Sequence, residues 1–89
     1  MLKIKEICKE RNMPLSKLAE ELHITPGALS QNIAGRVGLD RLEEIAEILG
    51  VNVKELFYDD GIFGFIKAKG VIYEIKSRQD IENLLKSIQ

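Results

Sequence analysis

Residues 18–35 read LAEELHITPGALSQNIAG and carry the signals for two short helices joined by a tight turn. Apolar residues recur at helical spacing in the first helix, and His23 then occupies a position that requires a left-handed backbone. Thr25 is a typical N-cap, and Pro26 suits the first position of the next helix. Gly35 is a typical residue just past a helix end. The stretch therefore predicts a helix-turn-helix whose second helix begins with small side chains.

Helical patterns continue on both sides of this stretch. Apolar stripes predict helices over residues 2–11 and 39–49. Asn52 can cap a one-turn helix through residues 54–57. Together with the helix-turn-helix, these segments predict a domain of five short helices over residues 1–60.

The pattern changes in the last third of the chain. β-Branched and aromatic residues form two runs, 62–66 and 71–75, and the segment between them contains the glycine that a hairpin turn favours. Ser77 and Asp80 then form a variant capping box before a last amphipathic helix. We therefore expect a ββα extension over residues 61–89, attached to a fold that is mainly α.

Three motifs are more specific than the apolar spacing. They are LAEEL at residues 18–22, the Gly35 that ends the third helix, and LEEIAEILGVNVKELF at residues 42–57. With these motifs, residues 2–57 resemble the Cro/lambda-repressor-like (XRE-type) helix-turn-helix family. The resemblance implies a five-helix lambda-repressor-like DNA-binding domain. In such a motif the first helix crosses the DNA backbone, and the N-terminal end of the second enters the major groove.

The resemblance also assigns positions to a DNA interface. Base-reading positions fall on Pro26, Gly27 and Gln31, with Ala28 near the groove, and a glutamine can form two hydrogen bonds with adenine. Phosphate-contacting positions fall at the start of the second helix, just past the third helix and at the start of the fourth. Thr25 and Ser30 are weaker candidates, because their hydroxyl groups can donate and accept hydrogen bonds. The full predicted set is Ser16, Lys17, Thr25, Pro26, Gly27, Ala28, Ser30, Gln31, Arg36 and Arg41.

The tip of the third helix departs from the family pattern. Where members carry polar or charged base-reading side chains, this chain has Pro26 and Gly27. The missing bulk would let the backbone approach DNA closely and would let the N–H groups of the first turn meet a phosphate. The alternative is that this surface no longer binds a specific sequence. Asn32 is a further departure, because an apolar or aromatic residue is common at its position.

Composition neither requires nor excludes nucleic acid. The 89 residues carry 13 Lys or Arg and 14 Asp or Glu, so only a local basic face is available. Cys8 and His23, the only cysteine and histidine, lie in different elements, which argues against a zinc site. Short apolar runs and a charged N-terminus predict neither a membrane span nor a signal peptide. We expect a cytoplasmic protein that is not an enzyme and takes no cofactor or small-molecule effector.

These observations predict a sequence-specific, DNA-binding transcriptional regulator that acts as a repressor and as a homodimer. Its partner would be double-stranded DNA. The alternative function is that of a protein-interaction module or an antitoxin-like partner protein, which uses the helix-turn-helix as a scaffold with little DNA specificity. The weak polarity of residues 26–28 favours the alternative, whereas Gln31, Arg36 and Arg41 favour DNA.

The ββα extension is the expected dimerisation element, because pairing around a two-fold axis would cover its open strand edges. The hairpin face expected to take part carries Phe63, Phe65, Val71, Tyr73 and Ile75. The alternative is that the extension packs on the fourth and fifth helices of its own chain. Lys67 and Lys69 fall in the expected turn, where solubility explains them more simply than contact with phosphate.

Overall fold

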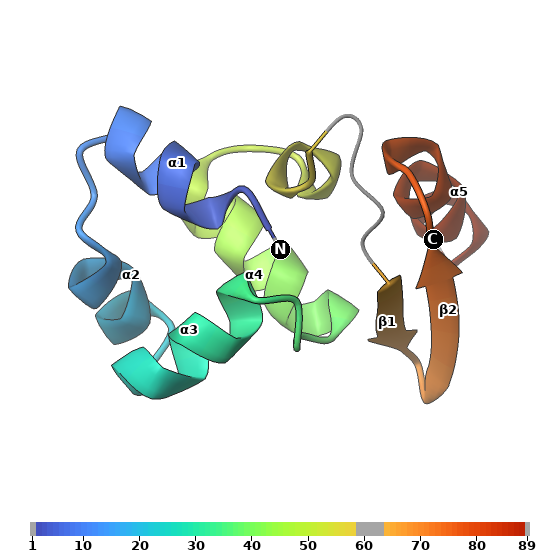
Figure 1. Ribbon diagram of the computed structural model, residues 1–89, viewed down its shortest axis with the longest axis horizontal. Coiled ribbons are helices and arrows are strands. Elements are labelled where there is room, and N and C mark those ends of the chain that lie inside the picture. Colours follow the sequence, from blue (N-terminus) through green and yellow to red (C-terminus); the bar gives the residue numbers. More distant parts are fainter. Residues whose placement is uncertain (1, 59–63, 89) are drawn as a thin grey trace.

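The computed structural model describes residues 2–58 and 64–88. Helices form the first part of the described chain, and a hairpin and a further helix follow (Figure 1). In chain order the elements are α1 (Ile4–Glu10), α2 (Leu15–Glu21), α3 (Pro26–Ile33), α4 (Leu39–Leu49), the 3-10 turn η1 (Val53–Leu56), β1 (Gly64–Ala68), β2 (Val71–Ile75) and α5 (Arg78–Ile88). The predicted fold class is confirmed, with the expected fifth helix present as a 3-10 turn.

The turn between α2 and α3 has the backbone that its sequence predicts. His23 has a φ of 58°, in the left-handed region. Thr25 Oγ1 accepts a hydrogen bond from the Ala28 N–H at 3.1 Å, and Pro26 takes the first helical position. Ala19 on α2 is buried, as expected of a small residue in a helix that packs on α3. Local capping and one left-handed residue therefore fix the helix-turn-helix.

Apolar side chains from α1, α2, α3, α4 and η1 are buried together in one core. The segment before α1 closes this core through two backbone hydrogen bonds. The Leu2 N–H donates to the Ile33 carbonyl at 2.8 Å, and the Lys3 N–H donates to the Leu56 carbonyl at 2.7 Å. Cys8 is buried as predicted, and desolvation raises the pKa of its thiol. The thiol is therefore part of the packing.

The hairpin turns more tightly than predicted. Lys69 and Gly70 alone form the turn, with φ values of 51° and 79°. Two positive φ values match the two-residue type I′ connection that the twist of a hairpin favours. Lys67, which we expected in the turn, is instead part of β1, where it lies opposite Ile72.

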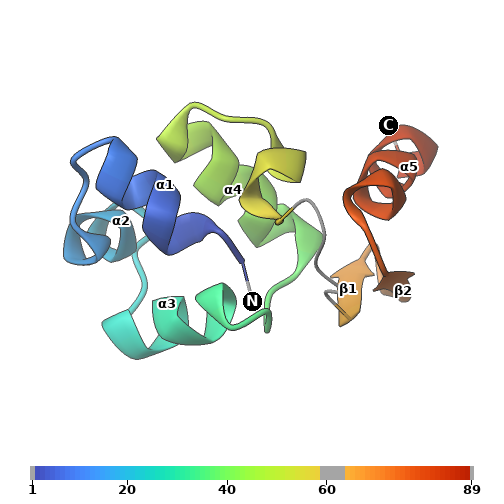
Figure 2. The ribbon, with the colours of Figure 1, turned by 45° about the horizontal axis from the view of Figure 1, so that its top comes forward.

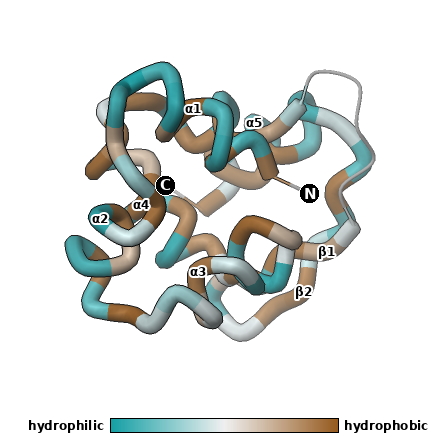
Figure 3. Tube along the Cα trace, turned by 60° about the vertical axis from the view of Figure 1, so that its left-hand side comes forward, coloured by the Kyte–Doolittle hydropathy of each residue, from teal (hydrophilic) through white to brown (hydrophobic). Residues whose placement is uncertain are grey.

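This register also corrects the predicted apolar face of the hairpin. The inner face carries Ile66, Ala68, Val71, Tyr73 and Ile75. Phe65 points to the opposite, outer face, so its predicted place is wrong, and Phe63 lies outside the described residues. The error has a simple cause: both strands are largely apolar (Figure 3), so alternation alone could not tell the two faces of β1 apart.

The inner face of the hairpin and α5 pack on the helices of the same chain (Figure 2). Ile66, Ile75 and Ile81 belong to the same buried cluster as the core of α1–α4. β1 contacts α4, while α5 contacts β2 and η1. The backbone of Gly38 also forms a parallel bridge with Lys67. The extension thus adopts the alternative arrangement, folded on its own fourth and fifth helices.

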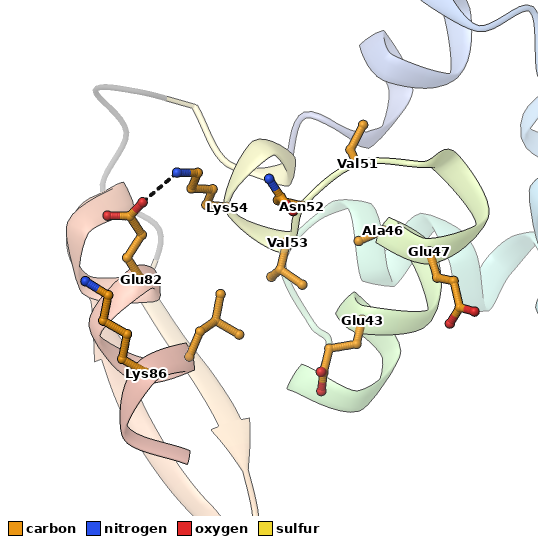
Figure 4. A pocket seen from close by; sticks show the side chains of 10 residues that line it. Glu43, Ala46, Glu47, Val51, Asn52, Val53, Lys54, Glu82 and Lys86 are labelled. Atoms are coloured by element: carbon orange, nitrogen blue, oxygen red, sulfur yellow. Dashed lines mark hydrogen bonds and ion pairs between the residues drawn. The ribbon is translucent and has the colours of Figure 1, made fainter. Parts of the chain in front are cut away.

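Polar contacts fix the position of α5. Lys54 Nζ lies 2.7 Å from Glu82 Oε1 at the edge of a groove between α4, η1 and α5 (Figure 4). The hydrogen bond from Lys54 and its positive charge lower the pKa of Glu82. Arg78 Nε donates to the Phe57 carbonyl oxygen at 3.0 Å. These contacts tie α5 to η1 in addition to the apolar packing.

The predicted capping box of α5 is present in a shifted form. Ser77 Oγ accepts from the Asp80 N–H at 3.4 Å. The Asp80 carboxylate accepts from the Lys76 N–H at 2.7 Å, one residue earlier than in a standard box.

Candidate nucleic-acid interface

The first turn of α3 leaves one backbone donor free. Pro26 has no N–H, the Ala28 N–H donates to Thr25 Oγ1, and the Leu29 N–H donates to the Thr25 carbonyl. Within the described residues the Gly27 N–H makes no hydrogen bond. A single N–H therefore remains at the helix tip, fewer than the several donors that we expected there.

The ten predicted DNA-contacting residues lie on the surface of α2, α3, the following loop and the start of α4. Ala28 and Arg41 are half-buried, and the other eight are exposed. Thr25 to Gln31 follow one another along α3, while Ser16 and Lys17 lie in the first turn of the neighbouring α2 (Figure 1). The structure thus presents these side chains to solvent from adjoining elements.

The cations of this set differ in their partners. Lys17 Nζ lies 3.4 Å from Glu21 on α2, and Arg41 Nε lies 3.3 Å from Glu44 on α4. Arg36 is exposed and forms no ion pair with any described residue. Of the three, Arg36 has its charge least compensated by a neighbour.

The loop that carries Arg36 is held by the end of α3. The Arg36 N–H donates to the Gln31 carbonyl at 2.9 Å, and the Gly35 N–H donates to the Asn32 carbonyl at 3.0 Å. These two bonds, with Gly35 at a φ of 110°, form a Schellman motif. Asn32 Nδ2 adds a hydrogen bond to the Arg36 carbonyl at 3.1 Å. The backbone of Arg36 is therefore fixed from both sides.

This positioning role of Asn32 was not predicted from the sequence, where the residue was only a departure from the family pattern. A polar side chain near a helix end nevertheless often binds a loop carbonyl. Asn32 Oδ1 is buried and has no hydrogen-bond partner among residues 2–58 and 64–88. Within the described residues, the polar contact of this side chain is the bond from its Nδ2 to the Arg36 carbonyl.

The comparison with family sequences decides what kind of domain this is. Residues 3–60 match the Cro/C1-type HTH DNA-binding domain. The chain belongs to this family. No curated protein and no solved structure gives a significant match. The resemblance over residues 2–57 is therefore confirmed, and the elements from α1 to η1 form a Cro/C1-type DNA-binding domain.

The hairpin and α5 lie outside the residues that the Cro/C1-type family matches. Across residues 2–58 and 64–88, no helix is long and apolar enough to cross a membrane. In the same part of the chain no group of His, Cys, Asp or Glu side chains could hold a metal ion.

Proposed function

We propose that this Cro/C1-type protein is a sequence-specific transcriptional regulator that binds operator DNA as a homodimer and represses by blocking polymerase. The observation that carries the proposal is the exposed surface of α3 within a DNA-binding domain of known family. The protein works in the cytoplasm without catalysis, cofactor or small-molecule effector. The ten residues Ser16, Lys17, Thr25, Pro26, Gly27, Ala28, Ser30, Gln31, Arg36 and Arg41 form its DNA interface.

In this proposal α3 lies in the major groove and α2 crosses the backbone. Gln31 is the main reader of a base edge, because its exposed side-chain amide makes no hydrogen bond within the described residues. Thr25 Oγ1 is already occupied as the cap of α3, so it contributes less to base recognition. Arg36 meets a phosphate beside the end of α3.

Arg36→Ala should weaken binding to every DNA sequence alike. An arginine that neutralises one phosphate releases about one counterion, so the slope of log affinity against log salt should fall by about one unit. A fluorescence-anisotropy titration at several salt concentrations measures this slope. Arg11→Ala is the matched control, since Arg11 is an exposed arginine outside the proposed interface. An unchanged slope in Arg36→Ala would remove Arg36 from the interface.

Gly27→Ala should stabilise the fold and weaken DNA binding. A Cβ at Gly27 would meet only Thr25 Oγ1, at 3.9 Å, so the fold itself does not require glycine there. Alanine should therefore raise the free energy of unfolding by about 0.5–1 kcal/mol. If Gly27 serves close approach to DNA, affinity should fall roughly tenfold, or about 1.4 kcal/mol. Thermal melts measure the effect on stability, and fluorescence anisotropy on the same preparation measures the effect on DNA affinity. Unchanged or tighter DNA binding would contradict a role of Gly27 in close approach to DNA.

A protein-interaction module or antitoxin-like partner protein is the second candidate function. Exposed apolar side chains on the hairpin favour it, as do Lys17 and Arg41, whose charges are paired with acids. The salt titration also separates the two functions. A wild-type protein that binds neither random nor selected duplexes at low salt would favour the second candidate.

A further inference from the structure

The exposed large hydrophobic side chains of the described residues all belong to the hairpin. Phe65 is 63% exposed, Val71 51% and Ile72 67%. Val71 lies at the rim of the inner face, whereas Phe65 and Ile72 share the outer face. Apolar side chains grouped at one place on a protein surface commonly mark an interaction site. The outer face of the hairpin is therefore a candidate for contact with another molecule.

Four exposed side chains on this outer face alternate between apolar and charged, both along each strand and across the two strands. Phe65 lies opposite Glu74, and Lys67 lies opposite Ile72. Phe65 and Ile72 therefore occupy one diagonal of the pattern. Lys67 and Glu74 occupy the other diagonal, with one positive and one negative charge.

We propose that a second copy of this chain docks on the outer face of the hairpin, with the two-fold axis along the Phe65–Ile72 diagonal. Rotation about that axis sets Phe65 against Phe65 of the partner subunit, and Ile72 against Ile72 of the partner subunit. It sets Lys67 against Glu74 of the partner subunit, and the reverse pair forms by symmetry. The inference rests on the proposed homodimer and names its surface.

The charges favour a second copy over nucleic acid at this face. Glu74 would repel phosphate, and DNA would leave Phe65 and Ile72 without apolar contacts. A second copy satisfies both charges and covers both apolar side chains. Within one chain Glu74 lies 3.2 Å from Lys76, but both side chains are more than half exposed, and such surface pairs contribute little. Glu74 can therefore exchange that contact for one across the interface.

The outer face of the hairpin lies beside the loop that follows α3. The face borders a groove whose other wall is the α3–α4 loop, with Arg36 and Val37. In Figure 1, α3 and the hairpin lie in different parts of the long axis, along which the Cα atoms extend 31 Å. A copy docked on this face would therefore lie next to that loop.

The surface buried between the two copies is small, and this limits the expected affinity of the dimer. An interface centred on four side chains falls below the roughly 1,200 Å² of stable complexes. The crossing angle of the two hairpins would be large, as in orthogonal sheet packing. We therefore expect a reversible dimer in free solution that DNA with two half-sites strengthens.

Sedimentation of the full chain without DNA tests the face by charge exchange. In a dimer of Lys67→Glu two acids would face each other at both contacts, and in a dimer of Glu74→Lys two cations would. Each variant alone should therefore dimerise at least about tenfold more weakly than the wild type. An equimolar mixture of the two variants pairs opposite charges at both positions. The mixture should therefore recover dimers that neither variant forms alone, which no effect within one chain can produce.

Phe65→Ser should also yield monomers, while the matched control Val71→Ser, an exposed apolar residue on the other face, should dimerise like the wild type. A wild-type chain that stays monomeric at every concentration, or a variant mixture without recovery, would overturn the proposal. DNA binding is tested separately, by measuring the affinity of Phe65→Ser for a single half-site, which needs no dimer. If the wild type dimerised but bound no DNA, the proposed DNA-binding function would be wrong and the docking surface would stand.

Discussion

Ile66→Ala should lower the free energy of unfolding by about 2–5 kcal/mol, the usual cost of truncating a fully buried isoleucine. Ile66 is 0% exposed and lies on β1, which packs on α4. Alanine would lose the transfer free energy of three carbon atoms and leave a cavity, because the two-residue turn and the Gly38–Lys67 bridge restrain β1 from collapsing inward. Urea unfolding followed by far-UV circular dichroism measures the change.

Ile72→Ala is the matched control for Ile66→Ala. It makes the same chemical change on the paired strand, at a side chain that is 67% exposed. In dilute, monomeric protein it should alter the free energy of unfolding by no more than about 0.5 kcal/mol. Similar effects at the two positions would contradict the described register, because they would mean that Ile66 and Ile72 are equally buried.

The same experiment tests whether the extension and the helices unfold together. They share one buried cluster, to which Ile75 and Ile81 contribute from the extension. Circular dichroism reports mainly the helices, and tyrosine fluorescence reports in part Tyr73 on β2. Coincident curves are expected for a single cooperative unit. If the first transition of Ile66→Ala changed only the tyrosine signal, the hairpin would unfold separately from the DNA-binding domain.

The helices were predictable because their limits are set locally. Thr25, Pro26 and Gly35 act through their own backbone and the adjacent turn, and the structure places each as predicted. The left-handed backbone of His23 was also predictable, because a tight connection between two helices needs one such residue. Eight of the ten predicted DNA-contacting residues are exposed, and for those on α2 and α3 this follows from the same helix phases.

The hairpin was harder to predict because each face of its strands carries large apolar side chains. Register then depends on the turn, and the tight Lys69–Gly70 turn moved Phe65 to the outer face. The bond from Asn32 to the Arg36 carbonyl was missed for another reason. It depends on the path of the chain after α3, which helical periodicity does not describe. The ion pairs of Lys17 and Arg41 depend on side-chain rotamers, which a sequence pattern leaves open.

Gln31→Ala should cost about 1–3 kcal/mol at one base pair of the operator and little elsewhere. The tip of α3 offers Pro26, Gly27 and Ala28, none of which has a polar side chain, so Gln31 is the strongest candidate for direct readout on that helix. Its side chain is exposed and free of hydrogen bonds within the described residues, so the variant should fold like the wild type.

Selection from a random duplex library, followed by affinity measurement on single-base variants, checks this prediction for Gln31. Gln79→Ala is the matched control, because Gln79 is an exposed glutamine on α5. Its side chain donates a hydrogen bond to Asn83 Oδ1. Gln31→Ala should select the same operator with one position relaxed, whereas Gln79→Ala should select it unchanged. If Gln31→Ala retained full preference at every position, direct readout by Gln31 would be wrong. Specificity would then rest on the shape and deformability of the DNA, which the backbone near Gly27 and the loop at Arg36 would sense.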